Sequence, residues 1–166
     1  MTHERYLRMT NATRRMLARL PFGERLLRLP TLLCALIYLF ALSGLMLTRD
    51  ARLLRAMLVP AACFCVCTVL RPLIGRQRPY DRFNIAPVGR YKPGKGKSMP
   101  SRHAASAAAI AFAVIYIVPS PWVAAAMIAL AIVIALLRVV SGQHYPSDVI
   151  AALLLSGVLS VVGYTL

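Results

Sequence analysis

Two histidines of this 166-residue chain lie in sequence contexts that suit nucleophilic and acid–base chemistry. His144 lies four residues before Asp148, and Pro146 between them suits the first turn of a helix, so the carboxylate can reach back to the imidazole. A carboxylate on one ring nitrogen fixes the tautomer of a histidine and stabilises its positively charged intermediate. We therefore predict His144 as a nucleophile that Asp148 orients, and His103 as the general acid that protonates the leaving group.

Several residues near these histidines could bind an anion. Ser101 lies where a helix is expected to begin, so we predict that it caps this helix and that the free backbone N–H groups point toward the site. Guanidinium groups bind phosphate oxygens through paired, charge-assisted hydrogen bonds. The predicted phosphate ligands are Arg71, Arg78, Ser101, Arg102 and Arg138. Alternatively, Arg71 and Arg78 anchor the chain at a membrane interface, and Arg102 is a surface residue.

The chemistry that these residues predict is phosphoryl transfer without a metal. Such transfer requires mainly positioning and stabilisation of the charge on the equatorial oxygens, which arginines and a helix N-terminus can provide. The sequence has no carboxylate cluster that would hold a metal ion, so we expect neither a metal nor another cofactor.

The elements that position these residues are apolar and long. Apolar residues make up 59% of the chain and the mean hydropathy is +0.67, which is typical of a membrane protein. A helix needs roughly 20 apolar residues to cross a hydrocarbon core. The predicted spans are 31–48, 53–70, 102–118, 121–139 and 147–166, with an active-site loop at 71–101. The predicted fold is an all-α integral membrane protein, with about five transmembrane helices forming a single domain over residues 1–166.

The N-terminal segment 1–29 is polar and basic. It interleaves arginines with Leu, Met and Phe, which predicts an amphipathic helix lying on an anionic membrane surface. A solvated tail is the alternative. The net charge of +15 could suggest nucleic-acid binding, but the basic residues flank the apolar spans, so we expect a lipid bilayer and no nucleic acid as the partner.

The order of the spans predicts that the unusual polar residues share one side of the membrane. Each crossing reverses the side, so the N-terminal segment, the loop at 71–101 and the short loop at 141–147 lie together. Basic segments favour the cytoplasm, which predicts a cytoplasmic site in a prokaryotic cell membrane. The orientation is reversed if the N-terminal segment re-enters the membrane or if the loop charges serve the substrate.

Three motifs resemble the signature of the type-two phosphatidic acid phosphatases and occur in the same order as in that family. These enzymes are also called lipid phosphate phosphatases, and they share a type of active site with vanadium haloperoxidases. The family motif Lys-x6-Arg-Pro is matched by Arg71-x6-Arg78-Pro79, and Pro-Ser-Gly-His by Pro100-Ser101-Arg102-His103. The third motif, Ser-Arg-x5-His-x3-Asp, is matched by Leu137-Arg138-x5-His144-x3-Asp148. The resemblance covers roughly the last hundred residues and implies a helical core with a phosphohistidine at His144.

The chain departs from the family pattern at three positions. Arg71 replaces Lys and keeps its charge, Arg102 replaces Gly and could add a phosphate contact or narrow the entrance, and Leu137 replaces Ser and loses a hydroxyl. The resemblance implies a metal-independent phosphatase acting on lipid phosphates or pyrophosphates of the isoprenyl or glycerophospholipid type. The alternatives are a lipid phosphotransferase that uses the same site and a non-catalytic anion-binding or transport protein. The sequence gives no indication of the oligomeric state.

Overall fold

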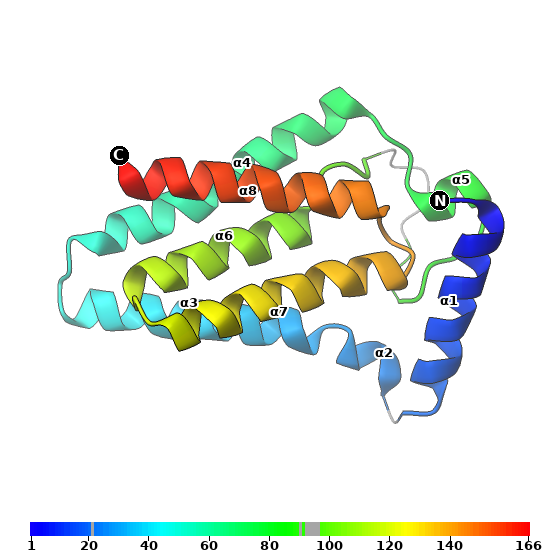
Figure 1. Ribbon diagram of the computed structural model, residues 1–166, viewed down its shortest axis with the longest axis horizontal. Helices are drawn as coiled ribbons and strands as arrows, with labels where there is room; N and C mark the ends of the chain where they lie inside the picture. Colours follow the sequence, from blue (N-terminus) through cyan, green and yellow to red (C-terminus); the bar gives the residue numbers. More distant parts are fainter. Residues whose placement is uncertain (21, 90, 92–96) are drawn as a thin grey trace.

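The computed structural model describes residues 1–20, 22–89, 91 and 97–166. Within these residues the chain is helical and has no strand (Figure 1). The helices are α1 His3–Ala18, α2 Gly23–Leu26, α3 Leu29–Leu47, α4 Arg52–Ile74, α5 Pro79–Phe83, α6 Arg102–Ile117, α7 Pro121–Val140 and α8 Pro146–Thr165. The prediction of an all-α membrane bundle is confirmed.

The bundle is organised around α6, which packs against α3, α4, α7 and α8 (Figure 1). The buried face of α6 consists mostly of alanines, and small side chains let neighbouring backbones approach closely in a membrane bundle. Ser156 of α8 donates a hydrogen bond of 2.9 Å to the Ala105 carbonyl of α6, which fixes the two helices relative to each other. The helix that begins next to His103 is therefore held on all sides by its neighbours.

Four helical segments are long and apolar enough to cross a membrane: Leu29–Leu47, Arg52–Phe83, Pro121–Val140 and Pro146–Thr165. The second of these segments comprises α4 and α5. The fifth predicted span corresponds to α6, which has 16 residues and is about 24 Å long at 1.5 Å per residue. This helix is shorter than a typical span. Because it packs against neighbouring helices at the centre of the bundle, its buried face does not need large apolar side chains. Its crossing of the membrane stays a prediction.

The helix α4 continues one turn beyond the predicted end at residue 70 and stops at Gly75. Gly75 adopts a left-handed conformation with φ 61°, in which glycine has no steric penalty, and its N–H bonds to the Arg71 carbonyl. Arg71 therefore lies in the last turn of a helix and not in the loop predicted at 71–101. This loop also contains the short helix α5, which begins with Pro79.

The basic N-terminal segment 1–29 is not one continuous helix. The helix α1 is followed by the one-turn helix α2, and α3 begins at Leu29. The helix α1 lies across one end of the bundle, where Tyr6 and Thr10 are buried, so this part of the chain is packed against the protein (Figure 1). Contact of the segment with a membrane surface stays a prediction.

The segments that carry the predicted site residues gather at the same end of the bundle as α1 and α5 (Figure 1). The α3–α4 turn, the α6–α7 turn and the C-terminus lie at the opposite end. This arrangement agrees with the grouping of loops that the order of the spans predicts.

Candidate active site

His144 and Asp148 are brought together by the start of α8. Pro146 occupies the first turn, and the Oδ2 atom of Asp148 accepts a hydrogen bond of 3.0 Å from the Tyr145 N–H. The same oxygen lies 3.6 Å from Nδ1 of His144, and both side chains are almost completely buried. The contact favours the tautomer that has its proton on Nδ1, so Nε2 is the nitrogen with a free lone pair.

Asp148 has two further partners, Arg76 and Ser98, which are not among the site residues predicted from the sequence. Nη1 of Arg76 lies 2.7 Å from Oδ1 of Asp148, and the Ser98 hydroxyl donates a hydrogen bond to Oδ2. The Ser98 N–H also donates to the Arg76 carbonyl at 2.8 Å. A buried carboxylate needs a charged partner and hydrogen-bond donors, so these two residues make the burial of Asp148 possible.

Some signal for these partners exists in the sequence, because Arg76 lies inside the first motif and Ser98 lies shortly before the second. A carboxylate predicted to be buried must have a cationic partner. The loop offers many arginines and lysines, however, and nothing in the sequence selects Arg76 among them.

The predicted phosphate ligands differ in their surroundings. Arg71 is buried and donates to the Lys97 carbonyl. Nη1 of Arg138 donates to Oε1 of Gln143 at 3.0 Å, and its Nη2 lies 3.4 Å from the Thr31 hydroxyl. These partners are neutral, so they hold the guanidinium groups without neutralising their charge.

Three buried polar atoms of the site have no hydrogen-bond partner among the described residues: Nε of Arg78, Nε of Arg138 and Oγ of Ser101. Buried polar groups nearly always have a partner, so such atoms point to a ligand or to water. Two of the three are guanidinium donors, and the hydroxyl of the third can donate as well. A tetrahedral oxyanion would satisfy them.

Ser101 occupies the N-cap position of α6, as predicted, but its side chain makes no capping hydrogen bond. The backbone of Ser101 instead donates to the Asp148 carbonyl at 3.0 Å, which joins the start of α6 to the start of α8. This bond connects the second motif to the third.

His103 is exposed at the start of α6, close enough to Arg138, Arg102 and Arg78 for their charges to act on it, and close enough to His144 for the two imidazoles to interact. The two histidines and three predicted phosphate ligands therefore share one electrostatic environment. The Arg102 guanidinium lies 5.8 Å from the centre of the Phe64 ring and is exposed, at the margin of this group.

A cavity of about 340 Å³ lies beside His103 between α3, α4, α6 and α7. Its lining is mostly apolar and includes Cys34, Phe64, Ile110 and Ile134. Such a cavity is suitable for an alkyl chain.

The helix α1 supports the loop that carries His144. The Tyr6 hydroxyl lies 3.2 Å from the Gly142 carbonyl oxygen and 3.3 Å from that of Ile85, so it can share its proton between them. Thr13 donates to the Val140 carbonyl at 3.0 Å. Burial raises the pKa of Tyr6, which keeps the phenol protonated as a donor.

Burial lowers the pKa of His144 from its ordinary value. The contact with Asp148 opposes this shift, while the charges of Arg78 and Arg71 add to it. The imidazole is therefore neutral at neutral pH, which is the form that a nucleophile needs. Among the described residues, no group of three or more His, Cys, Asp or Glu side chains is placed to hold a metal ion.

Comparison with known proteins identifies a matching family and curated relatives. A family model described as the PAP2 superfamily matches residues 52–166. A lipid A 1-phosphatase of Rhizobium etli is 37% identical over 103 residues, which are 58% of this chain and 42% of the relative. A lipid A 4'-phosphatase of Bacteroides thetaiotaomicron is 30% identical over 92 residues, which are 53% of this chain and 41% of the relative.

A solved structure shares the fold. The crystal structure of the first transmembrane PAP2-type phosphatidylglycerolphosphate phosphatase, from Bacillus subtilis, matches with a TM-score of 0.73 over 98% of this chain and 84% of that chain, at 21% identity. The matched regions span less than half the length of the curated relatives.

Proposed function

The chain belongs to the PAP2 superfamily, and from this premise we propose that it is a metal-independent phosphatase that hydrolyses membrane lipid phosphates or pyrophosphates through a phosphohistidine. The observation that carries the proposal is the His144–Asp148 pair, whose imidazole lies within the field of Arg78 and Arg71. A neutral imidazole oriented by a buried carboxylate is a nucleophile, and the guanidinium groups make an anionic phosphate its target.

In the first step, Nε2 of His144 attacks phosphorus, and the bond between phosphorus and the leaving oxygen of the lipid breaks. Arg71, Arg78 and Arg138 stabilise the charge on the equatorial oxygens, and Ser101 and Arg102 are candidates for further contacts.

The negative charge of the bound phosphate favours the protonated form of His103, and this proton passes to the leaving oxygen, so the lipid departs neutral at that atom. The positive charge that develops on His144 is stabilised by Asp148. In the second step, His103 takes a proton from water, the water oxygen bonds to phosphorus, and the bond from phosphorus to His144 breaks. Inorganic phosphate is released, and both histidines return to their starting states. Transfer to another lipid or sugar would differ only in the acceptor of this step.

The apolar cavity beside His103 supports a lipid substrate. A lipid tail between α3, α4, α6 and α7 would place the phosphate at the end of the bundle where the arginines gather. Isoprenyl and glycerophospholipid phosphates both have this form, and the names of the relatives extend the range to phosphorylated lipid A.

The test is phosphate release from purified protein in detergent with EDTA. Phosphatidic acid, phosphatidylglycerol phosphate, an isoprenyl pyrophosphate and lipid A serve as substrates. We expect release from at least one of them, its loss in His144→Ala, and full activity in His3→Ala, which removes an exposed histidine of α1. Full activity of folded His144→Ala would exclude His144 as the nucleophile.

We further propose, from the distribution of basic residues, that the site faces the cytoplasm. Cysteines introduced by Ser120→Cys and Gly94→Cys lie on opposite sides in the predicted topology, and position 94 lies outside the described residues. In intact cells, an impermeant thiol reagent should label the first variant and not the second. The reverse labelling would place the site on the outer face.

A further inference from the structure

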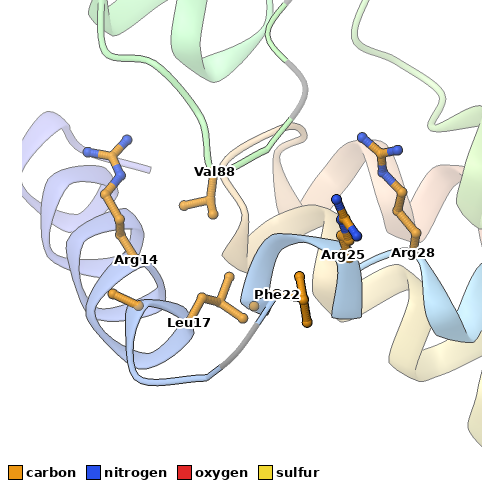
Figure 2. A pocket seen from close by; sticks show the side chains of 8 residues that line it. Arg14, Leu17, Phe22, Arg25, Arg28 and Val88 are labelled. Carbon is orange, nitrogen blue, oxygen red and sulfur yellow. The ribbon is translucent and has the colours of Figure 1, made fainter.

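A second cavity, of about 480 Å³, lies between α1, α2 and the segment around Val88 (Figure 2). Most of its lining comes from residues that precede the part matched by the family model. The helices α1 and α2, which carry most of its lining, lie at the same end of the bundle as the beginning of α8 (Figure 1).

The lining combines three arginines with an apolar surface. Figure 2 shows Arg14 on one side and Arg25 and Arg28 on the other, with Leu17, Phe22 and Val88 around the space between them. Guanidinium groups remain ionised at any workable pH and match the geometry of phosphate and carboxylate oxygens. The cavity is therefore suited to an anionic group that is attached to an apolar part of a molecule.

Two of these arginines, both exposed, contact neighbouring groups of the protein. Nη2 of Arg14 donates to the Ala86 carbonyl at 3.1 Å, and the Arg25 guanidinium lies 4.9 Å from the centre of the Phe22 ring. Guanidinium groups that are already positioned lose less conformational entropy when they bind a ligand. In Figure 2 the guanidinium groups of Arg14 and Arg25 lie on either side of Val88.

The cavity is connected to the catalytic site through its wall. The Val88 N–H donates to the Ser141 carbonyl at 2.9 Å, and the side-chain amide of Gln143 lies 3.5 Å from the Val88 carbonyl oxygen. The other end of the Gln143 side chain accepts from Arg138, and the charge of Arg28 acts on Arg138. An occupant of the cavity would thus lie next to a phosphate bound by Arg138.

We propose that this cavity is a second anion subsite, which binds another negatively charged group of the same lipid while its scissile phosphate lies at His144. The inference rests on the proposed function, which provides the first phosphate. It predicts that lipids with two separate phosphate groups on the head group bind more tightly than lipids with one.

The experiment compares a lipid that carries two phosphomonoesters with a matched lipid that carries one, both in neutral detergent micelles. The test variant is Arg14→Gln with Arg25→Gln. The control is Arg15→Gln with Arg19→Gln, which removes two exposed arginines of the same region that do not line the cavity. Both double variants lose two positive charges, so general attraction to anionic lipid is equal in them.

The test variant should raise the KM of the doubly phosphorylated lipid roughly tenfold, because charge-assisted hydrogen bonds are lost. The KM of the singly phosphorylated lipid and the kcat of both should stay unchanged, and the control should resemble the wild type. Equal changes for the two lipids, or equal changes in the two double variants, would overturn the proposal.

A failure of the proposed function has a different signature, because wild-type protein would then release phosphate from neither lipid. In that case the subsite is tested by equilibrium binding. The same two lipids are bound to His144→Ala with and without Arg14→Gln and Arg25→Gln. Tighter binding of the doubly phosphorylated lipid that depends on Arg14 and Arg25 supports the subsite, and equal binding overturns it.

Discussion

The Tyr6 hydroxyl lies 3.2 Å from the Gly142 carbonyl oxygen, across 136 positions of the sequence. This contact joins the N-terminal helix to the loop that carries His144. We predict that Tyr6→Phe, which keeps the ring and removes the donor, lowers the free energy of unfolding by about 1 kcal/mol and reduces kcat more than it raises KM. Thermal unfolding and steady-state kinetics measure the two effects, and a wild-type kcat would show that the loop does not need this support.

Gly142 cannot carry a side chain without rearrangement of α1. Its φ is +75°, and a Cβ atom would lie 2.6 Å from the Tyr6 hydroxyl and 2.7 Å from Cγ2 of Thr10. We expect Gly142→Ala to destabilise the protein by about 1–3 kcal/mol and to reduce activity. Gly44→Ala is the matched control, because a Cβ atom at this helical position would meet no other atom within 4 Å. Equal melting temperatures of the two variants would contradict the prediction.

Ser98 is predicted to act by positioning the carboxylate that orients His144. Ser98→Ala removes one of the donors to Asp148, so kcat should fall roughly tenfold with little change in KM, in line with the loss of a hydrogen bond to a charged group. Ser43→Ala, an exposed serine at the other end of the bundle, should leave kcat unchanged. A rise in KM alone would point to substrate binding instead of positioning.

The lowered pKa of His144 predicts a specific dependence on pH. The neutral imidazole persists below the ordinary histidine pKa of about 6.5, so the acidic decline of kcat/KM that belongs to His144 should lie below that pH. The unfolded chain takes up a proton at His144 near pH 6.5, before the folded chain does. The contribution of His144 to stability is therefore fully present above this pH and is lost as the pH falls below it.

Steady-state kinetics as a function of pH checks the first statement, and the pH dependence of thermal unfolding in wild-type protein and His144→Gln checks the second. The variant should lose part of the decrease in stability below pH 6.5. An acidic decline centred at or above pH 6.5 would show that the pKa of this imidazole is not lowered in the folded protein.

Local signals were sufficient for much of the fold. Pro121 and Pro146 mark the observed beginnings of α7 and α8, and the placement of Asp148 in the first turn of α8 follows from Pro146. The end of α4 depends on the competition between Pro72, which a helix tolerates poorly, and the left-handed Gly75. A sequence alone does not show which of the two ends the helix.

Contacts between distant segments account for what sequence reasoning missed. Ser98 and Arg76 reach Asp148 across 50 and 72 positions, and neither has a local pattern that identifies its partner. The basic cavity depends on a break between α1 and α2, whereas the sequence predicted one amphipathic helix over 1–29. Its arginines were predicted only as charges for a membrane surface.

The side chains of Arg76 and Ser98 both bind the Asp148 carboxylate. The Ser98 N–H also donates to the Arg76 carbonyl, so Asp148 holds this pair of residues at the start of α8 as well as orienting His144. An Asp148→Asn protein would weaken the attachment of Arg76 and Ser98 together with the orientation of the imidazole, and its kinetics would not separate these losses. Ser98 and Arg76 can be replaced one at a time, which makes them the positions where architecture and reactivity can be distinguished.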